Sequence, residues 1–229
     1  MLPVKINKNK ALDVSSHRYG NAPGRAALVH CARVLYRILH RTCRMRMKTD
    51  RPFKENVMEY SQLIKDRYSV RKLGSQSVEE DKVKAILEAA RVSPTAVNKQ
   101  PQRLLVLRSP ESMAKLKECT PYSFGAPMAI AVCCNWDEAW VRPYDNYNSG
   151  VIDAAVVGTH IMLAVHDLGL GSTWVGHFDP VLFREKFNLP ENIEPVVVFP
   201  IGYPAPEAKP AHLHAKRRPL EETVVYESF

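Results

Sequence analysis

The segment Arg67-x-Ser69-x-Arg71 places two guanidinium groups and a hydroxyl within five residues. Guanidinium groups bind phosphate oxygens with paired hydrogen bonds, and a nearby hydroxyl adds a further donor. The segment follows residues 59–66, whose pattern predicts a short helix. These residue types and their spacing indicate a phosphate-binding site, although a solvated helix end can have the same composition.

Two further segments carry groups suited to a flat, polar ring. The loop from Ser93 to Pro101 offers side-chain amides that both donate and accept hydrogen bonds, as the edge of a heteroaromatic ring requires. The stretch Trp174–His177 follows Gly169 and Gly171, so its backbone can approach a flat ligand closely. Each segment alone could equally be an ordinary connection or the end of a strand.

Several other kinds of site are excluded. The glycines of residues 169–176 have the wrong spacing for a dinucleotide fingerprint and follow a helix instead of a strand. The chain has no Walker motif and no G-x-S-x-G elbow. His212-x-His214 supplies only two possible metal ligands, so no metal is expected. Cys133 and Cys134 lie next to each other in an apolar stretch and are interpreted as structural thiols on opposite faces of a strand.

From Met58 onward, mixed helices and strands without regular alternation predict an α+β fold. Helices are predicted over residues 59–66, from a capping box at Ser77 and Glu80 to Pro94, from Pro110, over residues 151–168 and from Pro180. Strands are predicted over residues 104–107, 128–134, 195–201 and 223–226. The stretch 151–168 is apolar almost all round, which predicts a helix buried in the core or in a dimer interface.

The composition is that of a folded protein, with 229 residues, 45% hydrophobic and 24% charged. No apolar run reaches the roughly 18 residues that a membrane span needs. The formal net charge of +8 would suit a polyanionic partner, but residues 1–57 hold 13 Lys and Arg against 3 Asp and Glu. Residues 58–229 hold 19 against 21, so no nucleic-acid partner is expected for this body.

The basic segment, residues 1–57, allows three interpretations. Its apolar residues recur at helical spacing, and arginines lie between them; these apolar residues are Leu28, Cys31, Leu35, Ile38 and Leu39. Such a segment is typical of a transit peptide, of an arm that binds a membrane surface or nucleic acid, or of an upstream extension that precedes a natural start at Met58. We expect the body to be cytoplasmic, or to lie in an organelle if residues 1–57 are a transit peptide.

Five stretches, taken in order, resemble the FMN-dependent nitroreductase family: Arg67–Arg71, Ala90–Pro101, Asp153–Gly176, Ile201–Pro204 and the basic tail Lys216–Leu220. The resemblance runs from about Glu59 to Tyr226 and covers none of the basic segment. It implies a three-layer α+β sandwich with a central mixed or antiparallel sheet. It further implies an intertwined homodimer with two FMN sites at its interface.

The resemblance also assigns the phosphate half of the cofactor site. On the matched positions, Arg67 and Ser69 would hold the FMN phosphate together with Arg217 from the tail, with Tyr68 between them in the motif. Arg71 would lie near the N1/O2 edge of the flavin, where a cation stabilises the reduced ring.

The ring half is assigned to two segments. Contacts to the ring or the ribityl chain, made from the other subunit, would come from Pro94, Thr95, Ala96 and Asn98. The backbone lying against the ring would be that of Trp174, Val175 and Gly176, with the Gly176 amide as the candidate donor to flavin N5. Thr95 stands where the family usually has Ser, which keeps the hydroxyl.

The function implied is that of an oxidoreductase without a catalytic side chain. NAD(P)H would give a hydride to flavin N5, and an electron-poor small molecule such as a nitroaromatic or a quinone would then take its place over the ring. Two alternatives stay open: a specialised member of the family, reductive dehalogenase-like or flavin-consuming, and a basic-arm protein that binds nucleic acid or membrane and uses the body as a scaffold.

Overall fold

The structure, a computed structural model, describes residues 59–229. The predicted boundary after residue 57, the basic helix before it and the start at Met58 lie outside the described residues. Within residues 59–229 the chain has the α+β organisation that the sequence predicts. Helix α2 comprises Tyr60–Asp66 and leads directly into the arginine-rich segment that begins at Arg67.

The centre of the fold is a four-stranded antiparallel sheet in the order β1-β2-β4-β3. Its strands are β1 (Gln102–Leu107), β2 (Met128–Asn135), β3 (Gly171–Ser172) and β4 (Ile193–Gly202). Every residue of β2 is buried, because this strand lies inside the sheet and both of its faces are covered. Long apolar strands such as β2 and β4 are therefore the two central strands.

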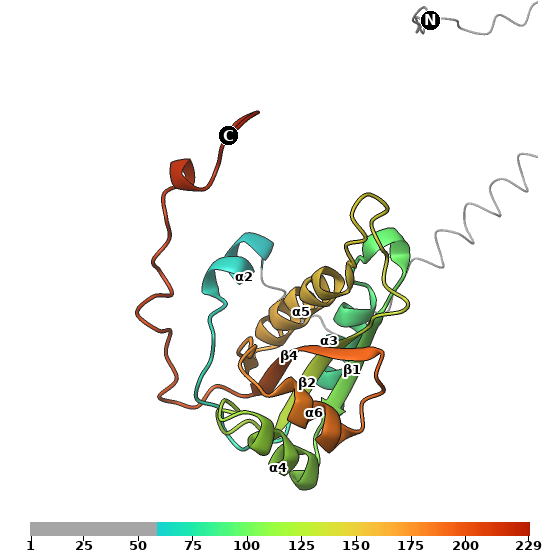
Figure 1. Cartoon of the computed structure of the whole chain (residues 1–229). Helices are drawn as coiled ribbons and strands as arrows, with labels where there is room; N and C mark the ends of the chain where they lie inside the picture. Colours follow the sequence, from blue (N-terminus) through green and yellow to red (C-terminus); the bar gives the residue numbers. More distant parts are fainter. Residues whose placement is uncertain (1–58) are drawn as a thin grey trace, which may run out of the picture. The chain divides into compact units, whose positions relative to one another are not determined.

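Two layers of helices cover the sheet, one on each face (Figure 1). Helices α3 (Glu80–Arg91) and α5 (Gly150–Asp167) pack on one face, and α4 (Pro110–Cys119) and α6 (Pro180–Phe187) on the other. Successive strand residues point to opposite faces. Ile130 of β2 thus joins the α3–α5 core, whereas Ala131 joins the α4–α6 core. The prediction of a three-layer sandwich is confirmed.

Helix α5 is the central element of its layer. Its buried residues include Ala154, Val157 and Ile161, which pack in one core with α3, β2 and β4. By length and composition alone, α5 would also be able to cross a membrane. It ends as predicted: Gly169 follows with φ 73°, a left-handed conformation that glycine adopts without strain, and the chain turns into β3.

The two adjacent cysteines are buried on opposite sides of the sheet. Cys133 belongs to the α4–α6 core, whereas the Sγ of Cys134 lies against the start of α5, where a Cβ on Gly150 would come within 2.3 Å of it. Burial raises the pKa of Cys133 to about 12 and that of Cys134 to about 11. Both thiols therefore stay protonated, in agreement with the structural role that the sequence predicts.

The predicted capping box at Ser77 and Glu80 is wrong. The N-cap of α3 is Glu79, two residues after Ser77, and no side chain caps the helix. Val78 is buried in the core, and its carbonyl accepts a hydrogen bond of 3.1 Å from Arg108. These contacts keep the chain extended up to Glu79, so the helix begins too late for Ser77 to reach its free amides.

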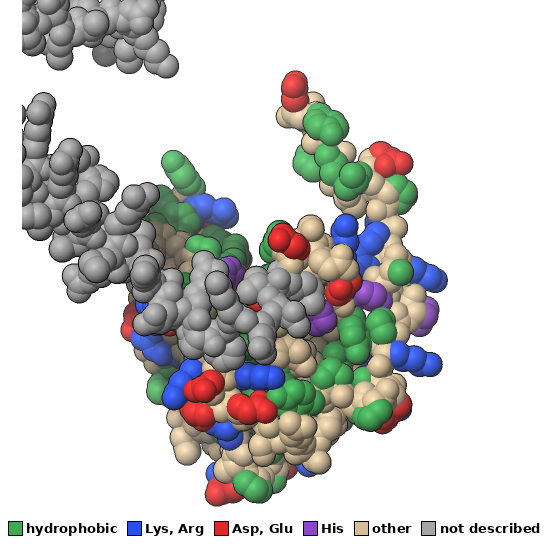
Figure 2. Space-filling view, turned by 180° about the vertical axis from the view of Figure 1, so that it is seen from behind, with side chains coloured by type: hydrophobic (Ala, Val, Ile, Leu, Met, Phe, Trp, Pro, Cys, Tyr) green, Lys and Arg blue, Asp and Glu red, His purple; other side chains and the backbone are tan. Residues whose placement is uncertain are grey.

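The predicted strand at residues 223–226 is wrong as well. No residue of this stretch pairs with another described strand, and a short 3-10 turn, Leu220–Glu222, precedes it. The apolar side chains that suggested a strand, such as those of Val225 and Tyr226, are exposed. The C-terminal segment runs past α2 (Figure 1), and Lys, Arg and His side chains gather along it in Figure 2.

A stability prediction follows from the cap of α6. The carboxylate of Asp179 accepts hydrogen bonds of 2.9 Å from the amides of Val181 and Leu182, as the Asp-Pro signal predicts. Asp179→Ala should lower the free energy of unfolding by about 1 kcal/mol in urea titrations. Asp179→Ser keeps an accepting oxygen and should recover most of this loss. Equal losses in both variants would show that the cap hydrogen bonds do not stabilise α6.

Candidate functional site

The structure brings the arginine-rich segment and the basic tail to one pocket. A cavity of about 220 Å³ is lined by Arg67, Tyr68, Ser69, Arg71, Ala211, Leu213, His214 and Arg217. Residues 67 and 217 are far apart in sequence. The tail meets the arginine-rich segment here: the rings of Tyr68 and His214 pack edge to face, with their centroids 6.2 Å apart. The four predicted phosphate-side residues and Arg71 thus lie together, although their role as ligands stays a prediction.

The electrostatics of this pocket favour an anion. Burial lowers the pKa of Arg67, and the positive charge of Arg217 lowers it further. Within residues 59–229, no carboxylate forms an ion pair with either guanidinium group. Arg217 instead donates to the carbonyls of His214 and Lys216, at 2.5 and 2.7 Å. A phosphate bound between these two cations would stabilise both.

A second pocket adjoins the first through Arg71, which lines both. It has a volume of about 320 Å³, and its other lining residues are Tyr122, Phe124, Thr173, Trp174, Val175, Gly176 and His177. The backbone of residues 173–176 is held beside the sheet by the bridge between Val175 and Val198. The Trp174 ring lies against Gly158 of α5. It also packs edge to face on the Phe199 ring, with the two ring centroids 5.2 Å apart. The site is therefore built on the rigid core.

The backbone amides of this second pocket differ in availability. The Val175 N–H donates to the Val198 carbonyl at 3.0 Å, so it is already used. The Gly176 N–H makes no hydrogen bond within the described residues, and a Cβ built on Gly176 would meet no atom within 4 Å. Gly176 thus presents a free donor in open space at the pocket wall, which suits close approach by a flat ligand.

Two aromatic residues of the second pocket, Tyr122 and Phe124, escaped the sequence interpretation, and the ring of His177 joins them there. Tyr122 and Phe124 stack with ring centroids 5.8 Å apart, and His177 meets Tyr122 edge to face at 5.3 Å. The buried Thr120 hydroxyl donates to the His177 carbonyl at 2.7 Å, which ties the two segments together. The sequence signal was a pair of aromatic residues two positions apart in a loop. That signal indicates a site only once the neighbouring segment is known.

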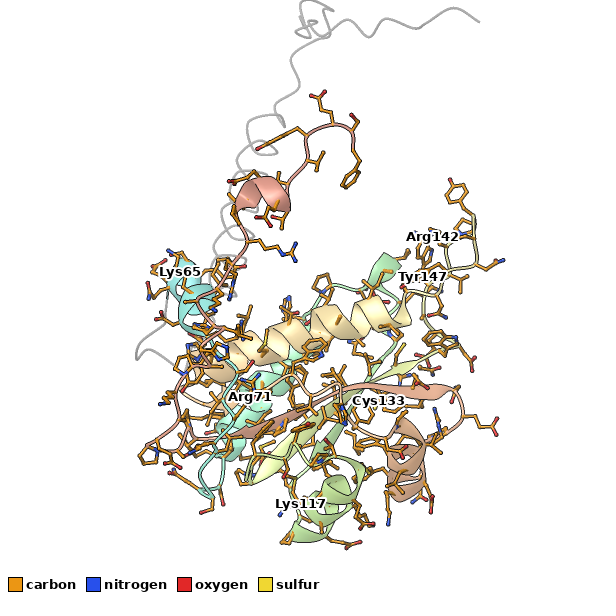
Figure 3. All side chains as sticks on the ribbon, turned by 60° about the vertical axis from the view of Figure 1, so that its left-hand side comes forward. Lys65, Arg71, Lys117, Cys133, Arg142 and Tyr147 are labelled. Atoms are coloured by element: carbon orange, nitrogen blue, oxygen red, sulfur yellow. The ribbon has the colours of Figure 1, made fainter. Side chains whose placement is uncertain are left out.

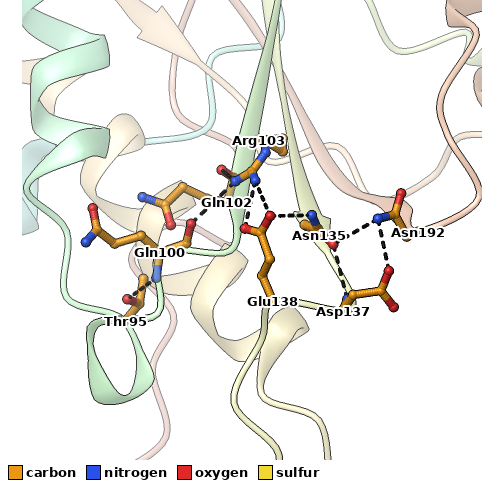
Figure 4. Close-up of polar contacts among 8 residues, drawn as sticks. All are labelled: Thr95, Gln100, Gln102, Arg103, Asn135, Asp137, Glu138 and Asn192. Carbon is orange, nitrogen blue, oxygen red and sulfur yellow. Dashed lines mark hydrogen bonds and ion pairs between the residues drawn. The ribbon is translucent and has the colours of Figure 1, made fainter.

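The predicted ring-contact loop borders a different pocket. Pro94, Thr95 and Ala96 line a cavity of about 350 Å³ together with Ile152 and other residues around the start of α5, whereas Asn98 is not among its lining residues. The hydroxyl of Thr95 accepts a hydrogen bond of 3.0 Å from the Gln100 amide (Figure 4). Because this bond uses the oxygen as acceptor, the O–H stays available to donate to a ligand.

The backbone of this loop is strained. Val97, Asn98 and Gln100 all have positive φ, between 51° and 54°. This conformation is uncommon for any residue with a side chain and most unfavourable for a β-branched one such as Val97, whose side chain is exposed. Each such residue costs on the order of 1–3 kcal/mol, and strain of this kind tends to occur at functional sites.

The loop pocket and the phosphate pocket border opposite ends of α5. Ala96 donates to Asp153 in the first turns of this helix, whereas Asp66 and Arg67 act electrostatically on His166 in its last turn, where burial lowers the pKa of the imidazole. Thirteen residues of helix separate these contacts by about 20 Å. In Figure 3, Lys65 of α2 lies near one end of α5, and Arg142 and Tyr147 lie near the other. The two pockets therefore adjoin opposite ends of this helix.

Comparison with known proteins identifies the family of this chain. The sequence profile described as "Nitroreductase family" matches residues 64–120 and 122–203, more than half of the chain. A Methanothermobacter thermautotrophicus protein named as an NADH dehydrogenase/NAD(P)H nitroreductase is 36% identical over 159 residues, which are 66% of this chain and 81% of the relative. The chain therefore belongs to the nitroreductase family.

Solved structures show the same fold. The crystal structure of a nitroreductase family protein from Clostridium difficile is similar with a TM-score of 0.71 and 40% identity, over 75% of this chain and all of the other. A nitroreductase from Exiguobacterium sibiricum, solved in complex with FMN, has a TM-score of 0.65 and 20% identity, over 76% of this chain and all of the other. At 20% identity, the comparison with the Exiguobacterium protein shows a shared fold and nothing further.

Proposed function

We propose that this chain is an FMN-dependent NAD(P)H oxidoreductase that acts as a homodimer on electron-poor small molecules such as nitroaromatics or quinones. The observation that carries the proposal is the convergence of Arg67, Ser69 and Arg217 on one pocket that continues, through Arg71, to the open backbone at Gly176. This order of groups matches a ligand with a phosphate at one end and a flat ring at the other. The family to which the chain belongs and the FMN held by a protein of the same fold support the assignment.

Each group of the chain has a physical task in this proposal. FMN, when bound, supplies the hydride chemistry between NAD(P)H and the acceptor. Arg67 and Arg217 neutralise the phosphate, and Ser69 donates to it. Arg71 brings a positive charge to the ring edge, which stabilises negative charge there. The free Gly176 amide donates to the ring, and the stacked Tyr122 and Phe124 border the space left for the acceptor.

The homodimer follows from the positions of the two pockets. The phosphate pocket and the loop Pro94–Asn98 adjoin opposite ends of α5, at positions 13 residues or roughly 20 Å of helix apart, which favours a flavin that takes each of them from a different chain. Two copies related by a twofold axis would bring the loop of each copy to the phosphate pocket of the other. Such isologous pairing is the commonest symmetry of oligomers, and it yields two equivalent sites.

The experiment that tests the function is an absorbance spectrum followed by turnover. Purified protein should be yellow or should take up added FMN, and NADH or NADPH should bleach the flavin under anaerobic conditions. Nitroaromatic, quinone and halogenated-phenol acceptors are then compared, which distinguishes the general activity from reductive dehalogenation. A colourless protein that takes up no FMN would overturn the proposal.

The phosphate pocket gives a specific binding prediction. Arg67→Ala should weaken FMN binding by about 1.5–3 kcal/mol, the worth of a charged hydrogen bond, which is roughly a 10- to 150-fold increase in the dissociation constant. Lys65→Ala removes the same charge from α2, outside the pocket, and serves as the control. Fluorescence titration of FMN measures both. An unchanged dissociation constant in Arg67→Ala would show that the phosphate binds elsewhere.

A further inference from the structure

Asp153 is a buried carboxylate that the proposed chemistry does not use. Its residue is only 3% exposed, although it lies in the first turns of the otherwise apolar helix α5. Its Oδ1 accepts a hydrogen bond of 2.8 Å from the Ala96 amide, and its Oδ2 accepts one of 2.8 Å from the Ser149 hydroxyl. No described cation forms an ion pair with it, so these hydrogen bonds and the helix N-terminus compensate its burial.

The helix start that carries Asp153 is itself fixed on the sheet. Gly150 approaches Cys134 of β2 so closely that no side chain fits at this position, and its amide donates to the Asn148 side chain at 2.9 Å. Asp153 therefore has a defined place relative to β2. A chain of contacts therefore links β2 to the loop: β2 contacts the start of α5, and the Asp153 carboxylate of α5 accepts from the Ala96 amide.

The loop at the end of this connection cannot hold its shape by local preference. Val97, Asn98 and Gln100 have positive φ, so the free chain would relax to other conformations. Hydrogen bonds oppose this relaxation. Among them, the Thr95 hydroxyl accepts from Gln100, within the loop, and Asp153 accepts from Ala96, outside it. At the end of the loop, Arg103 donates to the Gln100 carbonyl and Asn135 to the Pro101 carbonyl. Within residues 94–98, the bond to Asp153 is the described hydrogen bond that ties the loop to the core, so the placement of this part of the loop depends on it.

We propose that Asp153 is a positioning residue that holds the loop Pro94–Asn98, through the Ala96 amide, in the strained conformation that contacts the flavin ring. The inference rests on the proposed function. Asp153 acts through the loop and touches neither cofactor nor substrate. Its contribution is to the ring and not to the phosphate, because the loop lies at the end of α5 opposite the arginine pocket.

The test compares variants that differ in the acceptor they offer to Ala96. Asp153→Ala removes this acceptor, and we expect the FMN dissociation constant to rise at least about tenfold, the size expected when one hydrogen bond to a charged group is lost. Asp153→Asn keeps a carbonyl oxygen for the Ala96 amide and can donate to Ser149, so its dissociation constant should stay within about threefold of the unmodified protein. Ala96→Pro removes the donor instead and should reproduce the tenfold loss; Thr95 before it has φ −133° and ψ 159°, which proline accepts.

Riboflavin, which lacks the phosphate, separates this role from that of the arginines. Asp153→Ala should weaken riboflavin and FMN binding by the same factor, whereas Arg67→Ala should weaken FMN binding alone. Asp179→Ala is the control for lost stability, because its cap lies in α6 on the other face of the sheet; it should lower the unfolding temperature and leave both dissociation constants unchanged.

The outcomes are distinct. If Asp153→Ala and Ala96→Pro both bind FMN as the unmodified protein does, the inference is overturned while the proposed function stands. If Asp153→Asn binds as weakly as Asp153→Ala, the accepting oxygen is not the cause and the inference is overturned as well. If the unmodified protein binds neither flavin, the proposed function and this inference fall together.

Discussion

Gly176→Ala should fold normally and lose most of its affinity for FMN. A Cβ at this position meets no atom of the chain within 4 Å, and the backbone is outside the left-handed region, so the fold accepts the methyl group. The same methyl group would stand at the pocket wall, where the proposed ring lies against the backbone. Overpacking of a close contact costs about 1–3 kcal/mol, which corresponds to roughly a 5- to 150-fold higher dissociation constant.

Other glycines supply the controls for this variant. Gly74→Ala adds a methyl group that makes an ordinary contact of 3.7 Å with the Tyr203 carbonyl, away from the described pockets, and should change neither stability nor FMN binding. A Cβ on Gly171 would come within 2.8 Å of Val70, so Gly171→Ala should destabilise the fold itself. Thermal unfolding and FMN titration of the three variants measure this pattern. If Gly176→Ala bound FMN as tightly as the unmodified protein, Gly176 would not be part of the FMN site.

The sequence predicts the layers of this fold well because burial dominates them. Strand β2 is apolar from Met128 to Cys134, and α5 is apolar on most of its surface, so their positions follow from composition alone. The failures occur where a tertiary contact outweighs a local signal. Ser77 and Glu80 have the spacing of a capping box, but Arg108 and the burial of Val78 keep the chain extended past Ser77. Residues 223–226 have strand-forming side chains and no described strand beside them.

The site could be predicted only in part, for a related reason. Arginines and a serine at fixed spacing carry their chemistry in their side chains, so Arg67, Ser69 and Arg71 can be recognised locally. Asp153 and His177 lie in stretches that the sequence analysis names, but their side-chain contacts cannot be predicted, because these depend on which loop each one meets in the fold. The difference between the amides of Val175 and Gly176 is likewise set by the pairing with Val198, a contact that no local pattern encodes.

Two inactive variants should restore one flavin site when they share a dimer. The first variant, Arg67→Ala with Arg217→Ala, damages the phosphate pocket and leaves the loop intact. The second, Thr95→Ala with Asn98→Ala, damages the loop and leaves the phosphate pocket intact. If each site combines the pocket of one copy with the loop of the other, the mixed dimer contains one fully intact site and one that is damaged twice.

The mixed dimer should therefore bind about one FMN per two chains with the affinity of the unmodified protein, whereas each variant alone binds FMN weakly at both sites. Differently tagged chains, co-produced and purified through both tags, provide the mixed species, and FMN titration counts its sites. If pocket and loop served one site within a single chain, every site of the mixed dimer would be damaged and no tight binding would return. The prediction rests on the placement of the pocket and the loop at opposite ends of α5, roughly 20 Å of helix apart, which favours a site shared between two copies of the chain.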